Sequence, residues 1–133
     1  MKIQRVSYYF LSADDKPGAI SRLTSLLREA KVDLLGLWGF GVGHGKAQLF
    51  AVPKDKDLFR SALTSAKWDA VEGTCFRITS DDHVGALADV LDRVAAAGIN
   101  LQAVDAIGSS GEVGCFVWPQ EIDIPKLGEI LGA

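Results

Sequence analysis

Residues 14–20 of the chain read Asp14-Asp15-Lys16-Pro17-Gly18-Ala19-Ile20, and the pattern returns 67 positions later as Asp81-Asp82-His83-Val84-Gly85-Ala86-Leu87. After a deletion of one residue, residues 45–53 align with residues 111–119. Apolar positions between these segments also match, namely Leu23 with Val90, Leu27 with Val94, Val32 with Ile99 and Leu34 with Leu101. Self-similarity at a fixed period is the signature of a structural repeat, so the chain is predicted to hold two copies of one unit.

Each copy is predicted to begin with a β-strand and to continue with an amphipathic helix. Residues 6–11 and 75–78 have the β-branched and aromatic content of strands. Apolar residues then recur at spacings of three and four, which predicts a helix with one apolar stripe. These residues are Ile20, Leu23, Leu26, Leu27 and Ala30 in the first copy and Leu87, Val90, Leu91 and Val94 in the second.

The ends of these helices carry their own signals. Asp14 or Asp15 is expected to cap the first helix, and Pro17 fits a first helical turn because it has no N–H to lose. This helix is therefore predicted to begin near residue 17 and to end near Lys31. Gly98 stands where a left-handed residue ends the corresponding helix of the second copy.

A hairpin and a second helix complete each copy. The predicted hairpins pair residues 34–40 with 46–52 and residues 101–107 with 112–118 across glycine-rich turns. Apolar periodicity then predicts helices over residues 58–66 and 124–131. A short strand near Ala70-Val71 is expected to run on into the first strand of the second copy, which is predicted to lack a fourth strand of its own.

This order of elements predicts the fold class. Strand, helix, two strands, helix and strand form the split β-α-β or ferredoxin-like arrangement, with two helices on one face of an antiparallel sheet. We therefore expect an α+β protein made of two ferredoxin-like βαββαβ units in tandem, over residues 1–72 and 73–133. Such a unit buries little surface by itself, so the two are expected to pack together.

Composition excludes several classes of partner. The formal net charge is −3, with no run of Lys or Arg that would neutralise a row of phosphates, so nucleic acid is not an expected partner. No apolar stretch approaches the roughly 20 residues that span a bilayer, and no signal peptide is recognised, so we expect a cytoplasmic protein without a membrane partner. Cys75 and Cys115 are expected to be reduced core thiols, and no metal or other cofactor is expected.

No catalytic motif is found, so the chain is not expected to be an enzyme. The glycine run over residues 39–46 fails both GxxxxGK[ST] and GxGxxG and leads into a predicted strand, which favours a flexible hairpin over a phosphate-binding loop. The sequence has no Gx-Ser-xG elbow and no HExxH. Acylphosphatase chemistry needs a cationic loop after the first strand, whereas these loops are acidic apart from Lys16.

The repeated pattern resembles a known family. A strand, then Asp-x-Pro-Gly-x-Ile/Leu, a helix, and Val/Ile-Asp/Asn-Leu before a hairpin is similar to the ACT domain, a small regulatory module that binds amino acids in many metabolic enzymes. The resemblance covers both copies, although Val84 replaces the Pro in the second. It implies a ligand site where the loop between the first strand and first helix meets the start of the second strand, usually across an interface between two ACT units.

The family pattern maps onto particular residues. In serine-binding ACT domains one Asn precedes the Pro by two residues and another follows the first helix. These positions fall on Asp15, Asp82, Asp33 and Asn100, of which only Asn100 keeps the amide. A His of those members falls on Ala13 and Ser80, so that contact is missing. The expected ligand-binding residues are Asp15, Lys16, Pro17, Gly18, Ala19, Ile20, Asp33, Leu34, Asp82, His83, Val84, Gly85, Ala86, Leu87, Asn100 and Leu101.

The loops suit a zwitterion on physical grounds as well. The start of a helix offers unpaired N–H groups and a positive dipole end to a ligand carboxylate, and Asp15 or Asp82 suits its ammonium group. The alternative is that each Asp only caps its helix. Asp33 is expected to bond the local backbone, Asn100 is favoured as a ligand contact, and His83 either touches an anionic ligand or is merely solvated.

Two functions remain open from the sequence. The first is a non-catalytic regulatory module that binds a small amino acid and shifts a homodimer or a partner metabolic enzyme between states. The second is a protein-interaction subunit without a small ligand, which docks a partner through sheet edges and an aromatic surface that includes Trp38.

Overall fold

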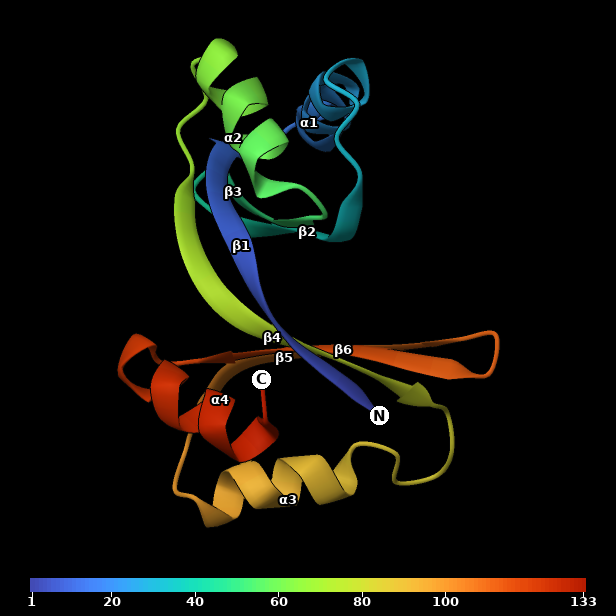
Figure 1. Ribbon diagram of the computed structural model, residues 1–133. Helices are drawn as coiled ribbons and strands as arrows, with labels where there is room; N and C mark the ends of the chain where they lie inside the picture. Colours follow the sequence, from blue (N-terminus) through green and yellow to red (C-terminus); the bar gives the residue numbers. More distant parts are fainter. The chain divides into compact units, whose positions relative to one another are not determined.

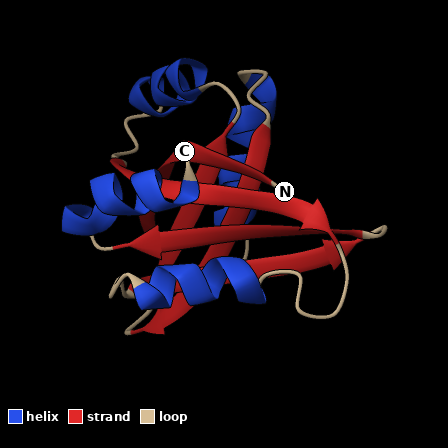
Figure 2. Ribbon diagram, turned by 60° about the horizontal axis from the view of Figure 1, so that its bottom comes forward, coloured by secondary structure: helices blue, strands red, loops and turns tan.

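The computed structural model describes residues 1–133, and its fold is α+β (Figure 1). Six strands are hydrogen-bonded in the order β2-β3-β1-β4-β6-β5, and β1 with β3, β2 with β3, β4 with β6 and β5 with β6 pair in antiparallel fashion. Figure 2 distinguishes these strands from the helices by colour. The elements are β1 (Lys2–Asp14), α1 (Ala19–Glu29), β2 (Leu34–Gly43), β3 (Lys46–Pro53), α2 (Lys56–Ser65), β4 (Val71–Asp81), α3 (Ala88–Ala96), β5 (Leu101–Ser109), β6 (Glu112–Pro119), a 3-10 turn (Glu121–Asp123) and α4 (Ile124–Leu131).

The chain divides into two compact units. We call residues 7–73 the first unit and residues 1–6 with 74–133 the second unit. β4 runs unbroken from Val71 to Asp81, as predicted for the junction between the copies. The repeat alone does not predict that residues 1–6 lie with the second unit. There they lie beside β4, where Arg77 Nη1 donates a hydrogen bond to Gln4 Oε1 (3.3 Å).

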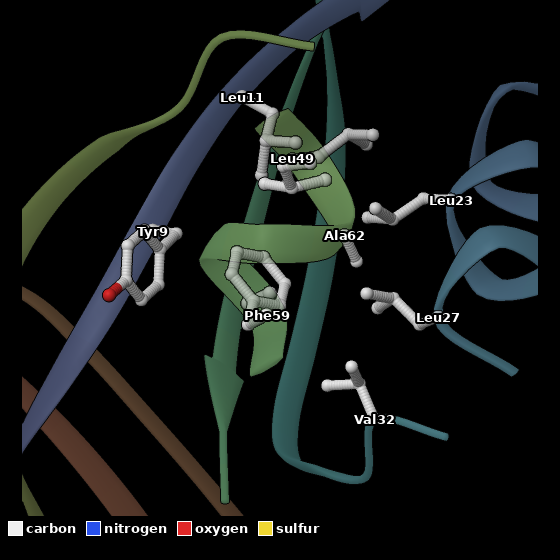
Figure 3. Close-up of a cluster of buried hydrophobic side chains, with 10 residues drawn as sticks. Tyr9, Leu11, Leu23, Leu27, Val32, Leu49, Phe59 and Ala62 are labelled. Atoms are coloured by element: carbon white, nitrogen blue, oxygen red, sulfur yellow. The ribbon is translucent and has the colours of Figure 1, made fainter. Parts of the chain in front are cut away.

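The core of the first unit lies between its helices and its strands (Figure 3). Leu23 and Leu27 point from α1 toward Phe59 and Ala62 of α2. The predicted apolar stripe of α1 is therefore confirmed at these two positions, but Ile20 is 38% exposed because it lies on the first turn of the helix beside β2. The remaining buried members of this core are Tyr9, Leu11, Val32, Leu49, Ala51 and Leu63.

The second unit has a core of the same design. Val90 and Val94 of α3 pack with Leu127 and Leu131 of α4. The strand residues of this core are Phe76, Ile78, Cys115 and Val117, with Ile99 from the segment before β5. Both helices of each unit therefore cover strand residues that alternate along the chain, as the apolar periodicity predicts.

The start of α1 differs from the prediction. The helix begins at Ala19 after Gly18, whose φ of 93° is left-handed, and no side chain caps it. Asp14 belongs to β1 instead and pairs with Lys46 (3.0 Å), which lowers the Asp14 pKa. Four residues, 15–18, connect β1 to α1, and the cap position falls on Gly18, so Asp14 and Asp15 lie too early to cap the helix. α3 likewise begins at Ala88 without a side-chain cap.

The two hairpin turns are of one type. His44 and Gly45 have φ of 57° and 70°, and Ser110 and Gly111 have φ of 54° and 81°. Positive φ at both central residues is the type I′ turn, whose twist matches that of the flanking strands. The hairpin interpretation of the glycine run is confirmed, and His44 is exposed at its tip. The predicted left-handed ending of the second copy's first helix is also confirmed, since Gly98 has a φ of 72°.

Cys75 and Cys115 are free, buried thiols, as predicted. Burial raises the pKa of Cys75 to about 12 and, together with the charge of Asp105, that of Cys115 to about 11.

The helices are short, and none of them combines the length and the apolar character needed to cross a membrane.

Both thiols are therefore expected to resist modification in the folded protein. With the pKa of Cys75 at about 12 and that of Cys115 at about 11, almost no thiolate is present near neutral pH. Titration with a chromogenic disulfide reagent should find no reactive thiol in the native protein and both thiols after denaturation. Fast labelling of either cysteine in the native state would contradict this account of the core.

Candidate ligand site at the strand-to-helix loops

A pocket of about 240 Å³ lies at the loop between β1 and α1. Five of the predicted site residues line it: Asp15, Lys16, Gly18, Ala19 and Ile20. Pro17 lies in the same loop and is exposed. The other lining residues are Ser21 of α1, Gly39, Phe40 and Gly41 of β2, and Ala47 and Leu49 of β3.

Backbone pairing fixes this loop against the hairpin. Asp15 N donates to Gly45 O at 2.9 Å, which extends the pairing of β1 with β3 past the end of the strand. In the second unit Asp82 N donates to Gly111 O at the same distance. The two loops therefore begin in the same way, as the repeat predicts.

Glycines in β2 and β5 make room for the loop carboxylates. A β-carbon at Gly41 would lie 2.5 Å from Asp15 Oδ2, and one at Gly108 would lie 2.9 Å from Asp82 Oδ2. Gly39 gives space to Ile20 in the same way, with a β-carbon there 2.5 Å from its Cδ1. Gly39, Gly41 and Gly108 were not among the residues predicted for the site. The sequence did contain a signal for them, because a glycine inside a strand often marks a place where another group comes close to the strand backbone.

The carboxylates of Asp15 and Asp82 have no hydrogen bond or ion pair in the chain. Neither caps its helix, so the capping alternative is wrong at both positions. In α2, by contrast, Asp55 does act as the cap, accepting from Asp57 N (3.0 Å) and Leu58 N (3.2 Å). The loop carboxylates are therefore held over a strand with their hydrogen-bonding capacity unused.

The first turn of α1 adds donors beside Asp15. A helix start leaves N–H groups without intrahelical acceptors. Here Ala19 N donates to Lys16 O (3.3 Å), whereas the N–H groups of Ile20 and Ser21 have no backbone acceptor. The pocket thus combines an acidic side chain, free N–H donors and the positive end of a helix dipole.

The second loop carries different side chains at the corresponding positions. His83 and Val84 are exposed, and Gly85 has a φ of 79°. Ala86 and Leu87 are partly buried, and Leu87 packs against the core of the second unit. Cation and proline in the first loop are thus replaced by imidazole and a branched apolar side chain in the second.

The predicted residues after the first helices lie elsewhere. Leu34 starts β2 and Leu101 starts β5, and both pack against their cores. Six residues of strand at roughly 3.3 Å each place Leu34 roughly 20 Å along β2 from Phe40. The structure therefore does not bring these residues to the loop of their own unit.

Asp33 is occupied locally, as predicted. Its Oδ1 accepts from Leu34 N (2.9 Å) and its Oδ2 pairs with Lys54 Nζ (2.7 Å). The hydrogen bond with Lys54 and that with the backbone lower the Asp33 pKa. Asn100 is exposed, and its amide forms no hydrogen bond in the chain.

Comparisons with known proteins concern the fold. No protein-family model matches the sequence, and no curated protein matches it. The structure of protein BT0572 from Bacteroides thetaiotaomicron is 19% identical, with a TM-score of 0.85 over 98% of this chain and 88% of that one. The ligand-free regulatory subunit of aspartate kinase from Thermus thermophilus is 16% identical, with a TM-score of 0.67 over 99% of this chain and 95% of that one.

A further solved structure agrees with these two. The regulatory subunit of aspartate kinase from Thermus flavus is 14% identical, with a TM-score of 0.62 over 98% of this chain and 94% of that one. At such identities the likeness shows the shared fold alone. It supports the ACT-domain fold that the repeated motif predicts.

Alanine at Asp15 or Asp82 is expected to leave stability unchanged, within about 0.5 kcal/mol, because surface side chains without partners contribute little. Asp55→Ala, which removes a real cap, should cost about 1 kcal/mol. Urea unfolding of the three variants measures the difference. If Asp15→Ala or Asp82→Ala destabilised the protein as much as Asp55→Ala, those carboxylates would have a structural role after all.

Proposed function

We propose that the chain is a tandem of two ACT units acting as a non-catalytic regulatory module, which binds a small amino acid at the loops after β1 and β4. The observation that carries this proposal is the unused carboxylate of Asp15 above Gly41, beside free N–H groups and a pocket. Asp82 above Gly108 repeats the arrangement.

The chemistry of the pocket suits an amino acid. An ammonium group donates to Asp15 in charge-assisted hydrogen bonds, and a carboxylate accepts from the first N–H groups of α1, with Lys16 nearby. A volume of about 240 Å³ is below the roughly 300–1,000 Å³ of pockets that hold drug-sized molecules, so the ligand is small. Ile20 and Phe40 supply the apolar contacts of its side chain.

The two loops are proposed to differ in affinity. Lys16 and Pro17 of the first correspond to His83 and Val84 of the second. Proline restricts its loop before binding, so less conformational entropy is lost there. Asn100 and Asp33 lie away from the loops of their own units, and a role in binding requires a loop other than that of their own unit, such as one from the second copy in the proposed homodimer.

The regulatory role rests on the same site. Regulatory subunits of aspartate kinase share the fold, which supports a module that acts on a metabolic enzyme. A ligand shifts a dimer or a partner enzyme between states only if it binds one state more tightly. Loops between strands and helices are suited to this role because their N–H groups and carboxylates change partners when a ligand binds.

A second function is favoured by one surface feature. Phe40 and Val42 of β2 are 56% and 48% exposed, and β2 is at an end of the strand order. An edge strand with exposed apolar side chains can pair with a strand of another chain. A protein-interaction subunit without its own small ligand would use this edge.

A thermal-shift screen against the twenty common amino acids separates the two functions. A ligand that binds the folded state raises the melting temperature by mass action, so one or a few amino acids at millimolar concentration should raise it by several degrees. Asp15→Ala and Asp82→Ala should reduce this rise without changing the melting temperature of the free protein. Gly108→Ala should act like Asp82→Ala, because its β-carbon displaces that carboxylate.

Asp55→Ala is the matched control, since it lowers the melting temperature but keeps the ligand-induced rise. A screen in which no amino acid raises the melting temperature would contradict the binding module and favour the interaction subunit.

A further inference from the structure

A second and larger pocket, of about 700 Å³, lies in the first unit away from the loop site. It is formed by the end of α2, the segment that follows it, and facing residues of β1 and β4. Its lining residues are Tyr9, Arg60, Leu63, Thr64, Lys67, Trp68, Asp69, Ala70 and Glu72. None of them lines the loop pocket.

The walls of this pocket are held in place. Tyr9 is 2% exposed and packs on Phe59, with ring centroids 4.7 Å apart, and its hydroxyl points away from Leu23 and Leu27 (Figure 3). Trp68 Nε1 donates to Ser12 O (3.1 Å), and the Arg22 guanidinium lies 4.4 Å from the centroid of the Trp68 ring. The pocket is therefore formed before any ligand arrives.

Some of the charged side chains that line this pocket have partners in the chain and others have none. The Glu72 carboxylate accepts from the Tyr9 hydroxyl (2.5 Å) and lies 4.0 Å from Lys56 Nζ. Arg60 and Lys67 form no ion pair and no side-chain hydrogen bond in the chain. Two cations with unused donors thus line a pocket in which one of the two carboxylates is already engaged.

The second unit fills the corresponding place with its own side chain. At the offset of 67, Phe76 stands for Tyr9 and Arg5 stands for Glu72. The Arg5 guanidinium lies over the Phe76 ring, 5.5 Å from its centroid, and donates to Ala133 O (3.0 Å). A β-carbon at Gly128 of α4 would collide with this guanidinium, so the glycine makes room for it.

The first unit reverses this arrangement. Its strand position carries Glu72, whose carboxylate is held by Tyr9, and no side chain occupies the space as Arg5 does in the second unit. Its cations, Arg60 and Lys67, come instead from α2 and the segment that follows it, and both line the pocket.

We propose that this pocket is a second ligand site, which binds a small organic carboxylate through Arg60 and Lys67. The planar guanidinium accepts a carboxylate in paired hydrogen bonds, and Lys67 adds a point charge. Asp69 and Glu72 line the same pocket and disfavour a phosphate, which carries about −1.5 to −2 charges. The site is independent of the amino-acid site at the loops, since the two share no residue.

Propionate, a monocarboxylate with less negative charge than phosphate, is the probe that tests this site, in a titration of the full chain followed by amide and indole NMR signals. It should be raised to about 20 mM, enough to saturate a site with a Kd of about 1 mM. We expect saturable shifts of the backbone signals of residues 60–72 and of the Trp68 indole N–H. Inorganic phosphate at equal concentration should bind more weakly there, and tighter binding of phosphate would overturn the assignment to a carboxylate.

Lys67→Gly is the decisive variant, with Lys31→Gly as its matched control. Both lysines follow a helix in the left-handed conformation, with φ of 54° and 59°, so glycine suits both backbones, but only Lys67 lines the pocket. Lys67→Gly and Arg60→Gln should each weaken propionate binding by about fivefold, as expected for one partly exposed charge, and Lys31→Gly should not. Absence of saturable shifts at residues 60–72, or equal affinity in all three variants, would overturn the proposal.

Discussion

Strand β1 serves both units, and much of the remaining structure depends on this sharing. Its thirteen residues exceed the usual five or six of a strand. Residues 7–14 belong to the first unit, where residues 9–14 pair with β3, and residues 2–6 belong to the second unit. β4 is divided in the same way at Gly73, so each unit holds the end of a strand that continues in the other unit. The second copy, which has no last strand of its own in sequence order, is thereby completed by residues 1–6.

This sharing makes the two copies chemically different. In the first unit the aromatic ring is on β1 and the residue that faces it comes from β4. In the second unit the ring is on β4 and the facing residue comes from β1. The sequences of these two facing segments differ. Glu72 therefore meets Tyr9, whereas Arg5 meets Phe76. One arrangement leaves a pocket and the other fills it, although both copies keep the same core. The backbones of the loops after β1 and β4 differ less. In each loop the Asp N–H donates to a glycine carbonyl of the hairpin turn, and a strand glycine leaves room for the Asp carboxylate.

The sequence predicted the parts of the fold that periodicity and turn residues determine. It did not predict the parts that depend on which segments, far apart in sequence, lie close together in the folded chain. Helix stripes, hairpins and the continuous β4 follow from local patterns. The absence of a cap at Asp15 depends on how many residues the chain needs to reverse direction before α1. The roles of Gly41 and Gly108 depend on which side chain comes to lie above them. The placement of residues 1–6 depends on pairing between segments far apart in sequence, which no local pattern encodes.

The strand-to-helix loops are proposed to bind a ligand through carboxylates that have no partner in the chain. Backbone NMR of the full chain, titrated with an amino acid that stabilises it, tests this most directly. The account predicts shifts that saturate together at residues 15–21 and 39–41, with a second set at residues 82–87 of different affinity. Binding that shifts signals elsewhere and leaves both loops unchanged would contradict it.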